Sequence, residues 1–376
     1  MSEFAAGPAG RIERVRALMV ERGYDAIVVR DEANLRWLTG VKGVFDYTFE
    51  FPHAAFITAD QCLFHTDSRY LNSFEENTPV GSPWVYDMDE GTIPGWVAGK
   101  IAANKCRVCA VEDDMQINFY QGIQRGLEDR SVACMLPLMH DDIRKMRAVK
   151  DAEEIELMRH AQSITDAAFQ HMLGFIKPGM TEKQVRNELE NFMFANGADS
   201  LAFGSIVASG PNTANPHAVP SDRVIEKGDF VLMDYGAGYC DYRSDMTRTV
   251  VMGEPTQEQL DLYALVRRTH EECVAAIHPG VEGNDIFKLS KKIIGDAGYG
   301  DYYNHGLGHG VGIDIHELPN FNRSKNIIEV GSVITMEPGV YLPGVGGVRL
   351  EDYGVVTENG YEPFTKTPHD LHVIDC

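Results

Sequence analysis

Two stretches of the chain, GDFVLMD (228–234) and GSVITME (331–337), decide the fold because they repeat one pattern. Each begins with glycine, continues through apolar, strand-like residues and ends in methionine followed by an acid. Upstream of them, KPGMTEKQV (177–185) matches HPGVEGNDI (278–286) at nearly the same spacing. Such an ordered series of matches predicts two half-domains of the same construction.

A second acid follows each of these predicted strands. Asp245 and Glu351 each stand a few residues before a Val-Val pair. We therefore expect each half to run helix–helix–strand–strand and to present two carboxylates. A pseudo-two-fold axis would bring the four acids together: Asp234, Asp245, Glu337 and Glu351. Strand pairing can place Asp234 and Asp245 face to face, and the same holds for the pair in the second half.

Converging carboxylates of this kind indicate a metal centre. Four acids in a core repel one another and cannot all stay ionised unless cations lie between them. His309, in HGLGHGVGIDIHE (305–317), adds an imidazole. Carboxylates with one imidazole suit Mn²⁺, Co²⁺ or Zn²⁺, and two such ions form a hydrolytic centre. The alternative, four solvated surface acids, fits poorly because each acid ends or follows an apolar run.

Histidines cluster in the same glycine-rich stretch, at 305, 309 and 316. The glycines permit close backbone approach. A dinucleotide-binding interpretation is weak, because no clean strand precedes them and no ribose-binding acid lies suitably downstream. A single histidine is more often structural, but three so close together favour a functional site. His217 stands in the polar loop ASGPNTANPHAVPSD (208–222). From the residues alone it could be a surface side chain or part of the functional site.

The chain before residue 143 alternates predicted helices and strands, which is typical of a compact α/β domain over residues 1–142. Its clearest elements are a helix near 12–23, a strand at 25–30, a hairpin at 54–59 and 62–66, a strand at 108–112 and a helix at 117–129. From residue 143 onward, capping boxes open long helices at Asp151, Thr181 and Thr256. The fold class is therefore predicted as α+β, with the larger domain over residues 143–376.

Composition excludes several functions. The formal net charge is −22, whereas a nucleic-acid or anionic-membrane binder needs the opposite sign. No apolar run approaches the roughly 20 residues needed to span a bilayer. The start, MSEFAAGPAGR, lacks the basic and apolar regions of a secretory signal. Seven cysteines in a long chain do not suggest a disulfide framework, and Cys106-x-x-Cys109 has no second Cys/His pair nearby. We therefore expect a cytoplasmic protein that binds neither nucleic acid nor membrane.

Several motifs together resemble the creatinase/prolidase/aminopeptidase P family. These are VLMDYGAGYCDYRSDMTRT (231–249), HGLGHGVGIDIHE, TMEPGVY (335–341) and GVRLED (347–352). The resemblance covers nearly the whole chain, since RALMVERGYDAIVVRDEANLRWLTG (16–40) is similar to the start of the family's N-terminal domain. It implies a pita-bread catalytic domain preceded by a smaller creatinase-like α/β domain, and a bacterial Xaa-Pro dipeptidase or Xaa-Pro aminopeptidase activity.

The resemblance also implies roles for individual residues. Asp234 would hold one ion, His309 and Glu337 the other, and Asp245 and Glu351 would bridge both. Mn²⁺ is the expected metal, with Co²⁺ or Zn²⁺ as alternatives. Further residues are expected to line the substrate pocket: His217, His305, His316 and Arg349.

In the implied mechanism Glu337 is the general base for a metal-activated water, and His217 and His316 stabilise the oxyanion. The substrate is a proline-containing peptide, and the family resemblance implies a homodimer. Other readings stay open: another metal-dependent hydrolase or lyase on the same fold, or a non-catalytic binding protein. Creatinase itself shares the fold but works without metal.

Overall fold

The computed structural model describes residues 7–42, 52–88, 91–322 and 325–376. The chain divides into two compact units, Met1–Arg147 and Ala148–Cys376. The boundary predicted after residue 142 falls at the start of helix α6 (Asp142–Ala148), and the units divide near the end of that helix. The first six residues of MSEFAAGPAGR, the start that lacks the regions of a secretory signal, lie outside the described segments. None of the helices in these segments combines the length and apolar character needed to cross a bilayer.

A five-stranded mixed sheet forms the centre of the first unit. Its strand order is β4-β3-β2-β1-β5, with β2 antiparallel to both neighbours and β5 parallel to β1. The strands are β1 (Ala26–Val29), β2 (Ala54–Thr58), β3 (Cys62–His65), β4 (Val85–Asp87) and β5 (Cys109–Val111). The helices are α1 (Gly7–Arg22), α2 (Glu32–Thr39), α3 (Leu71–Asn77), α4 (Ile93–Ala103) and α5 (Ile117–Asp129). The predicted hairpin and the predicted helix at 117–129 are therefore confirmed.

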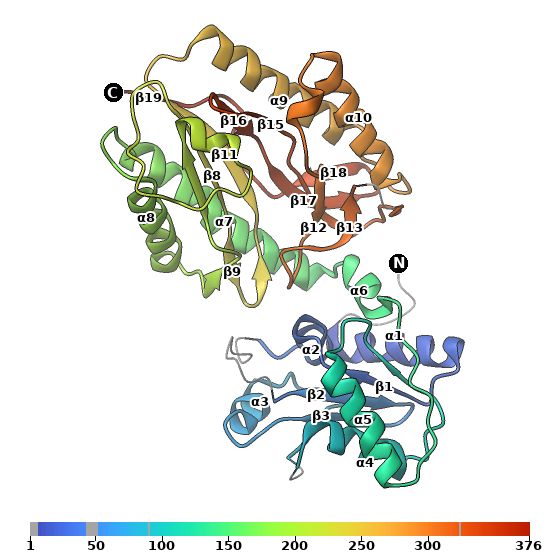
Figure 1. Ribbon diagram of the computed structural model, residues 1–376. Helices are drawn as coiled ribbons and strands as arrows, with labels where there is room; N and C mark the ends of the chain where they lie inside the picture. Colours follow the sequence, from blue (N-terminus) through green and yellow to red (C-terminus); the bar gives the residue numbers. More distant parts are fainter. Residues whose placement is uncertain (1–6, 43–51, 89–90, 323–324) are drawn as a thin grey trace. The chain divides into compact units, whose positions relative to one another are not determined.

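The second unit begins with the first of the two predicted half-domains (Figure 1). Helices α7 (Ala152–Phe175) and α8 (Glu182–Ala195) pack against each other and against strands that follow them. These strands are β6 (Ser200–Leu201), β7 (Ile206–Ser209), β8 (Phe230–Tyr235), β9 (Ala237–Tyr239), β10 (Tyr242–Arg243) and β11 (Met246–Met252), with the short helix η1 (Gly210–Ala214) between β7 and β8. The C-terminal β19 (Val373–Ile374) joins them in the sheet β19-β11-β8-β7.

The second half repeats this plan, as the sequence predicted. Helices α9 (Gln257–Ala275) and α10 (Gly283–Asp296) precede the sheet β13-β12-β14-β17-β18 (Figure 1). Its strands are β12 (Gly308–Gly310), β13 (Glu317–Phe321), β14 (Val333–Met336), β17 (Asp352–Thr357) and β18 (Gly360–Pro363). The short helix η2 (Gly300–Tyr302) follows α10, and β15 (Gly339–Leu342) with β16 (Gly346–Arg349) forms a separate hairpin.

Helix caps and apolar packing explain why each half folds as it does. Complete capping boxes open α7, α8 and α9 at Asp151, Thr181 and Thr256, and each cap contributes about 1 kcal/mol. In the first half, side chains from α7, α8, β7, β8 and β11 share one buried apolar cluster. In the second half, α9, α10, β13, β14 and β17 contribute to an equivalent cluster. The strands that carry the acids are thus fixed between two helix layers.

Candidate metal centre

The four acids stand at the ends of equivalent strands, but the two halves pair them differently. In the first half Asp234 lies opposite Thr247, which stands two residues after Asp245. The predicted face-to-face pairing of Asp234 with Asp245 is therefore wrong in detail. In the second half Met336 pairs with Asp352, so continuing that register places the next residues, Glu337 and Glu351, opposite each other.

His309 turns its free ring nitrogen toward the acids. It lies on β12, and its Nδ1 is 3.0 Å from the Gly310 carbonyl oxygen. A carbonyl only accepts, so Nδ1 carries the proton and Nε2 is left as an acceptor. Nε2 lies 3.6 Å from Asp245 Oδ2 and 3.6 Å from Glu337 Oε1. Donor atoms of Asp245, His309 and Glu351 all lie within 4.8 Å of one another.

Burial and mutual repulsion disfavour charge on these acids. Burial, together with the neighbouring Glu351, raises the pKa of Asp245 well above its usual value. Burial and the neighbouring Glu337 do the same for Glu351. Burial raises the pKa of Glu337 to about 8, although Arg349 opposes this. The carboxylates can therefore all be anionic only with added positive charge between them.

Two further features of these side chains suit metal binding: the imidazole of His309 is neutral, and one oxygen of Asp234 lacks a hydrogen bond. Burial, helped by the neighbouring His316, lowers the pKa of His309 to about 3, so its imidazole is neutral, the form that binds metal. Asp234 Oδ1 is buried and finds no hydrogen-bond partner among the residues described. A buried carboxylate oxygen without a partner is costly, and a cation beside it would relieve that cost.

Arg349 is buried in the middle of this arrangement, at the end of β16. Its Nη2 donates to Asp234 Oδ2, and its Nε donates to Thr247 Oγ1 at 3.0 Å. Its Nη1 donates to the Tyr341 hydroxyl at 2.9 Å and to the Pro216 carbonyl at 3.3 Å. The guanidinium is thus engaged within the protein. These contacts favour a positioning role over the substrate-carboxylate fork expected from the sequence.

The predicted pocket histidines lie around the same space. His305 is half-buried, with Nε2 2.9 Å from the Tyr341 hydroxyl and Nδ1 2.7 Å from the Gly306 carbonyl oxygen. His316 is exposed, and its ring packs edge-to-face on His309 with centroids 4.3 Å apart. His217 is exposed in the loop after η1. The structure brings all nine predicted residues to one cavity of about 630 Å³, the size of a small-molecule site.

Several residues that shape this cavity were not predicted. Thr247 donates from Oγ1 to Glu351 Oε2 at 2.7 Å and so orients that acid. Tyr341 connects His305 to Arg349. Apolar side chains are also among the residues that line the cavity: Phe203, Ile206, Val219 and Ile315. Thr247 stands two residues after Asp245 and could have been found by strand periodicity, whereas the wall residues carry no local signal.

Gly308, directly before His309, is required for close packing. A Cβ at this position would stand 2.3 Å from the Thr335 carbonyl oxygen. We expect Gly308→Ala to destabilise the fold by about 1–3 kcal/mol, as overpacking does, and to weaken metal binding because it displaces His309. Urea unfolding and the metal content of the purified protein measure the two effects.

The matched control is Gly174→Ala, near the end of α7. A Cβ there meets no atom within 4 Å, so stability should stay the same or rise by about 0.5 kcal/mol. If Gly308→Ala were as stable and as metal-rich as the unchanged chain, the close approach of β12 to β14 would not constrain His309.

Comparison with known proteins identifies the family. A model of metallopeptidase family M24 matches residues 156–358, which is more than half of the chain. The chain belongs to metallopeptidase family M24. A model of the creatinase/prolidase N-terminal domain matches residues 11–149. The family resemblance drawn from the motifs, the pita-bread fold class and the assignment as a metallopeptidase are therefore confirmed.

Relatives of this M24 chain extend over its full length. It is 41% identical over 362 residues to an Xaa-Pro dipeptidase of Pyrococcus horikoshii, covering 96% of this chain and 98% of that one. A solved Xaa-Pro dipeptidase from Bacillus anthracis superposes with a TM-score of 0.89 at 36% identity, covering 98% of this chain and all of the other. An X-Pro aminopeptidase from Thermotoga maritima gives 0.85 at 30% identity, covering 97% and 100%. Membership of a metallopeptidase family implies divalent metal binding.

Proposed function

We propose that this M24 metallopeptidase hydrolyses the bond between a residue and proline, in dipeptides or at peptide N-termini. The observation that carries the proposal is the convergence of four carboxylates and His309 on one cavity. Full-length relatives named as Xaa-Pro dipeptidases, and one named as an X-Pro aminopeptidase, support the choice of bond. The sequence motifs serve both activities, so the choice between them falls to the assay below.

Two divalent ions are proposed at this centre, with Mn²⁺ expected and Co²⁺ or Zn²⁺ as alternatives. Asp234 would hold one ion, His309 and Glu337 the other, and Asp245 and Glu351 both. When bound, such ions lower the pKa of water to near neutrality and polarise a carbonyl oxygen. The acids' raised pKa values support this assignment, because deprotonation of buried acids requires a nearby cation.

Glu337 is the proposed general base. It lies on the cavity, its Oε1 is close to His309 Nε2, and burial has raised its pKa to about 8. With divalent ions beside it Glu337 would be anionic, and a carboxylate within reach of the attacking water can accept its proton. Glu337 would take a proton from water and deliver it to the nitrogen of the leaving proline.

His217 and His316 are the proposed oxyanion donors. Both are exposed, and both line the cavity. Burial and the neighbouring His217 lower the pKa of His316, so its ring is neutral and offers one N–H. Donors that meet the scissile carbonyl oxygen as negative charge develops stabilise the tetrahedral transition state.

The apolar wall of the cavity suits a proline ring. Phe203, Ile206, Val219 and Ile315 line the cavity that His217 also lines. Proline is rigid and lacks an N–H, so a site that recognises it must do so through shape and apolar contact rather than hydrogen bonding. His305, held by Tyr341, borders the same space and is proposed to contact substrate.

The experiment that tests this function compares three substrates. The metal-loaded chain is assayed on an Xaa-Pro dipeptide, on an Xaa-Pro-Yaa-Zaa peptide and on the matching Xaa-Ala dipeptide. We expect hydrolysis of at least one proline substrate and little of the alanine one. Cleavage of the dipeptide alone would identify a dipeptidase. Failure on both proline substrates with Mn²⁺, Co²⁺ and Zn²⁺ would point to another hydrolase or a lyase.

Arg349→Lys separates positioning from substrate binding. Lysine keeps the charge but cannot reach Asp234, Thr247 and Tyr341 at once. We expect activity to fall equally on Xaa-Pro and Xaa-Pro-Yaa-Zaa, together with lower metal content, because Asp234 loses its partner. The measurements are kcat, KM and metal per chain. A rise in KM confined to the free dipeptide, with metal unchanged, would instead assign Arg349 to the substrate carboxylate.

We also propose a homodimer, from the family resemblance, and a cytoplasmic location, from the composition and the cysteine usage. The net charge of −22 disfavours binding to nucleic acid or to an anionic membrane, because like charges repel. Light scattering of the purified chain measures the oligomeric state.

A further inference from the structure

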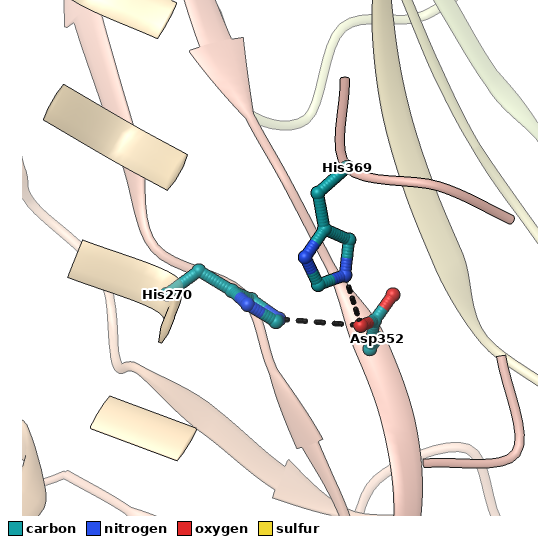
Figure 2. A group of neighbouring side chains, drawn as sticks. All are labelled: His270, Asp352 and His369. Carbon is teal, nitrogen blue, oxygen red and sulfur yellow. Dashed lines mark hydrogen bonds and ion pairs between the residues drawn. The ribbon is translucent and has the colours of Figure 1, made fainter. Parts of the chain in front are cut away.

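A second cluster of metal-binding side chains lies apart from the five proposed ligands. Figure 2 shows His270, from α9, and His369, from the segment between β18 and β19, both directed at Asp352 at the start of β17. His369 Nε2 lies 2.5 Å from Asp352 Oδ2, and His270 Nε2 lies 3.7 Å from the same oxygen. The three donor atoms are within 4.8 Å of one another.

His270 is the atypical member of this cluster. Its side chain is 1% exposed, and neither ring nitrogen has a hydrogen-bond partner within the described part of the chain. A buried polar atom without a partner costs roughly 1–3 kcal/mol. Burial also lowers the pKa of His270 to about 4, so the ring is neutral and can act as a ligand. A neutral imidazole that has no hydrogen bond and faces a carboxylate is suited to bind a metal ion.

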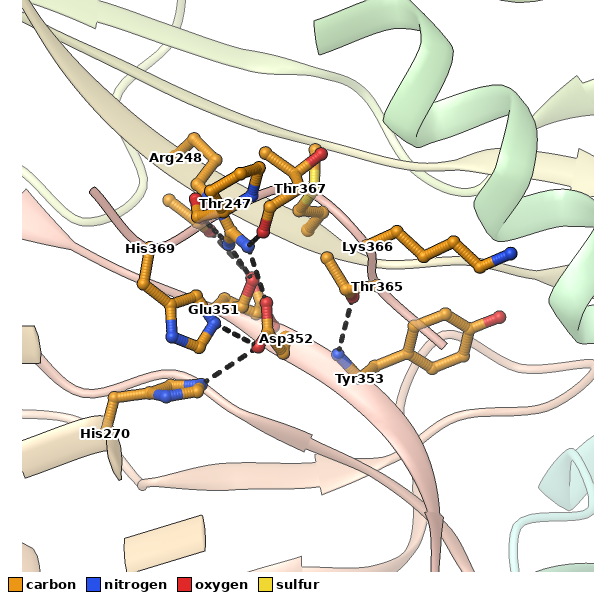
Figure 3. Close-up of polar contacts among 12 residues, drawn as sticks. Thr247, Arg248, His270, Glu351, Asp352, Tyr353, Thr365, Lys366, Thr367 and His369 are labelled. Atoms are coloured by element: carbon orange, nitrogen blue, oxygen red, sulfur yellow. Dashed lines mark hydrogen bonds and ion pairs between the residues drawn. The ribbon is translucent and has the colours of Figure 1, made fainter. Parts of the chain in front are cut away.

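The carboxylate is oriented by its other oxygen. Asp352 Oδ1 accepts from Arg248 Nη2 at 2.7 Å, and Arg248 also donates to the backbone carbonyls of Thr367 and Glu351 (Figure 3). The guanidinium thus fixes Asp352 and leaves Oδ2 to the two imidazoles. A ligand carboxylate held by a second hydrogen bond is the usual outer-shell arrangement of metal sites.

The cluster is separate from the hydrolytic centre even though Glu351 and Asp352 are consecutive. Successive residues on an extended strand point to opposite faces. Glu351 lines the large cavity, whereas Asp352 is not part of its lining and contacts His270 and His369 instead. An ion between the two histidines would therefore occupy its own position.

We propose that His270, Asp352 and His369 form a mononuclear Zn²⁺ site. Two imidazoles and one carboxylate are a donor set that Zn²⁺ accepts, with water as a fourth ligand. Bonds of about 2.0–2.2 Å in tetrahedral geometry place neighbouring donors roughly 3.3 Å apart. That separation lies between the 2.5 and 3.7 Å observed here. His369 has a side chain 26% exposed, which leaves a path for the ion and room for the water.

The three ligands come from α9, from the start of β17 and from the segment between β18 and β19, which are far apart in the sequence. An ion that binds all three only in the folded chain stabilises the fold by mass action. Zn²⁺ is therefore expected to raise the melting temperature through this site as well as through the hydrolytic centre.

Zinc counting on three variants tests the proposal. The full-length chain and each variant are stripped with chelator, reloaded with excess Zn²⁺, freed of unbound metal and analysed for zinc per chain. His369→Gln can still donate to Asp352 but is a poor zinc ligand, and His270→Gln is the second variant. His278→Gln is the control, because His278 is an exposed histidine of the same unit. We expect both site variants to hold one zinc fewer than the control and the unchanged chain.

Equal zinc content in all four proteins would overturn the proposal, and the result does not depend on how many ions the hydrolytic centre holds. A direct measurement covers the case in which a variant fails to fold. Anomalous diffraction at the zinc edge from the unchanged chain should show a peak within about 2.0–2.2 Å of all three side chains. Its absence in zinc-soaked crystals would equally reject the site.

Discussion

Asp245→Asn is expected to lower kcat for Xaa-Pro hydrolysis by roughly a thousandfold or more. Asparagine keeps the size of the side chain but removes the charge, and Asp245 lies between Glu351, Glu337 and His309 with only 4% of its side chain exposed. On the proposed assignment Asp245 binds both ions, so replacing it by a neutral amide should lose metal. Since bound ions contribute several kcal/mol to the transition state, their loss has the stated effect on rate. Steady-state kinetics and metal per chain measure it.

The control for this prediction is Asp285→Asn, an exposed acid on α10 whose ion pair among the described residues is with Lys288. It should leave rate and metal content unchanged. Incubation of the unchanged chain with a chelator should abolish activity, and Mn²⁺ or Co²⁺ should restore it. Full activity in a rigorously metal-free preparation would reject the two-ion centre and favour a metal-independent reaction such as that of creatinase.

The helices and the repeat could be predicted because their signals are local. Capping boxes at Asp151, Thr181 and Thr256 mark helix starts within four residues of sequence, and all three helices begin there. The repeated strand endings at Asp234 and Glu337 needed only comparison of the chain with itself. Each signal is a short-range preference that tertiary packing reinforces rather than overrides.

Register was harder to predict than element type. Nothing in the sequence shows that β9 and β10 form their own small sheet with β6, so the distance between Asp234 and Asp245 along the chain suggested a simple hairpin. In the structure Asp245 lies two residues out of register with Asp234. The role of Arg349 was hard to predict for a similar reason. Its contacts with Tyr341 and Pro216 depend on the β15–β16 hairpin, whose position sequence periodicity does not predict.

The cluster of His270, Asp352 and His369 was invisible to sequence reasoning for a related reason. Its members come from a helix interior, a strand start and a C-terminal segment, without a motif that joins them. From the sequence alone, each of the three residues could be an unrelated polar side chain. Only their shared orientation toward one carboxylate oxygen, with no other partner for His270 in the described residues, makes them a candidate site.

His316→Ala is expected to lower kcat by about 10²–10³ while metal content stays the same. His316 lines the cavity and its ring is neutral, so it can donate one N–H to an oxyanion. Loss of one such donor typically costs this factor. KM should change little, because the interaction strengthens only as charge develops. The measurements are kcat, KM and metal per chain, with the exposed His278→Ala as the matched control.

Because His316 packs on His309, the main alternative is that His316 orients this proposed metal ligand instead of contacting the substrate. The two rings lie edge-to-face with centroids 4.3 Å apart, so His316 could act by holding the ligand ring in place. In that case His316→Ala would lose metal, and added Mn²⁺ at high concentration would restore much of kcat. If metal stays bound and the rate still falls, the residue acts on the substrate. If neither metal nor rate changes, the oxyanion role is rejected, and His217→Ala becomes the variant that decides whether this cavity supplies any side-chain donor at all.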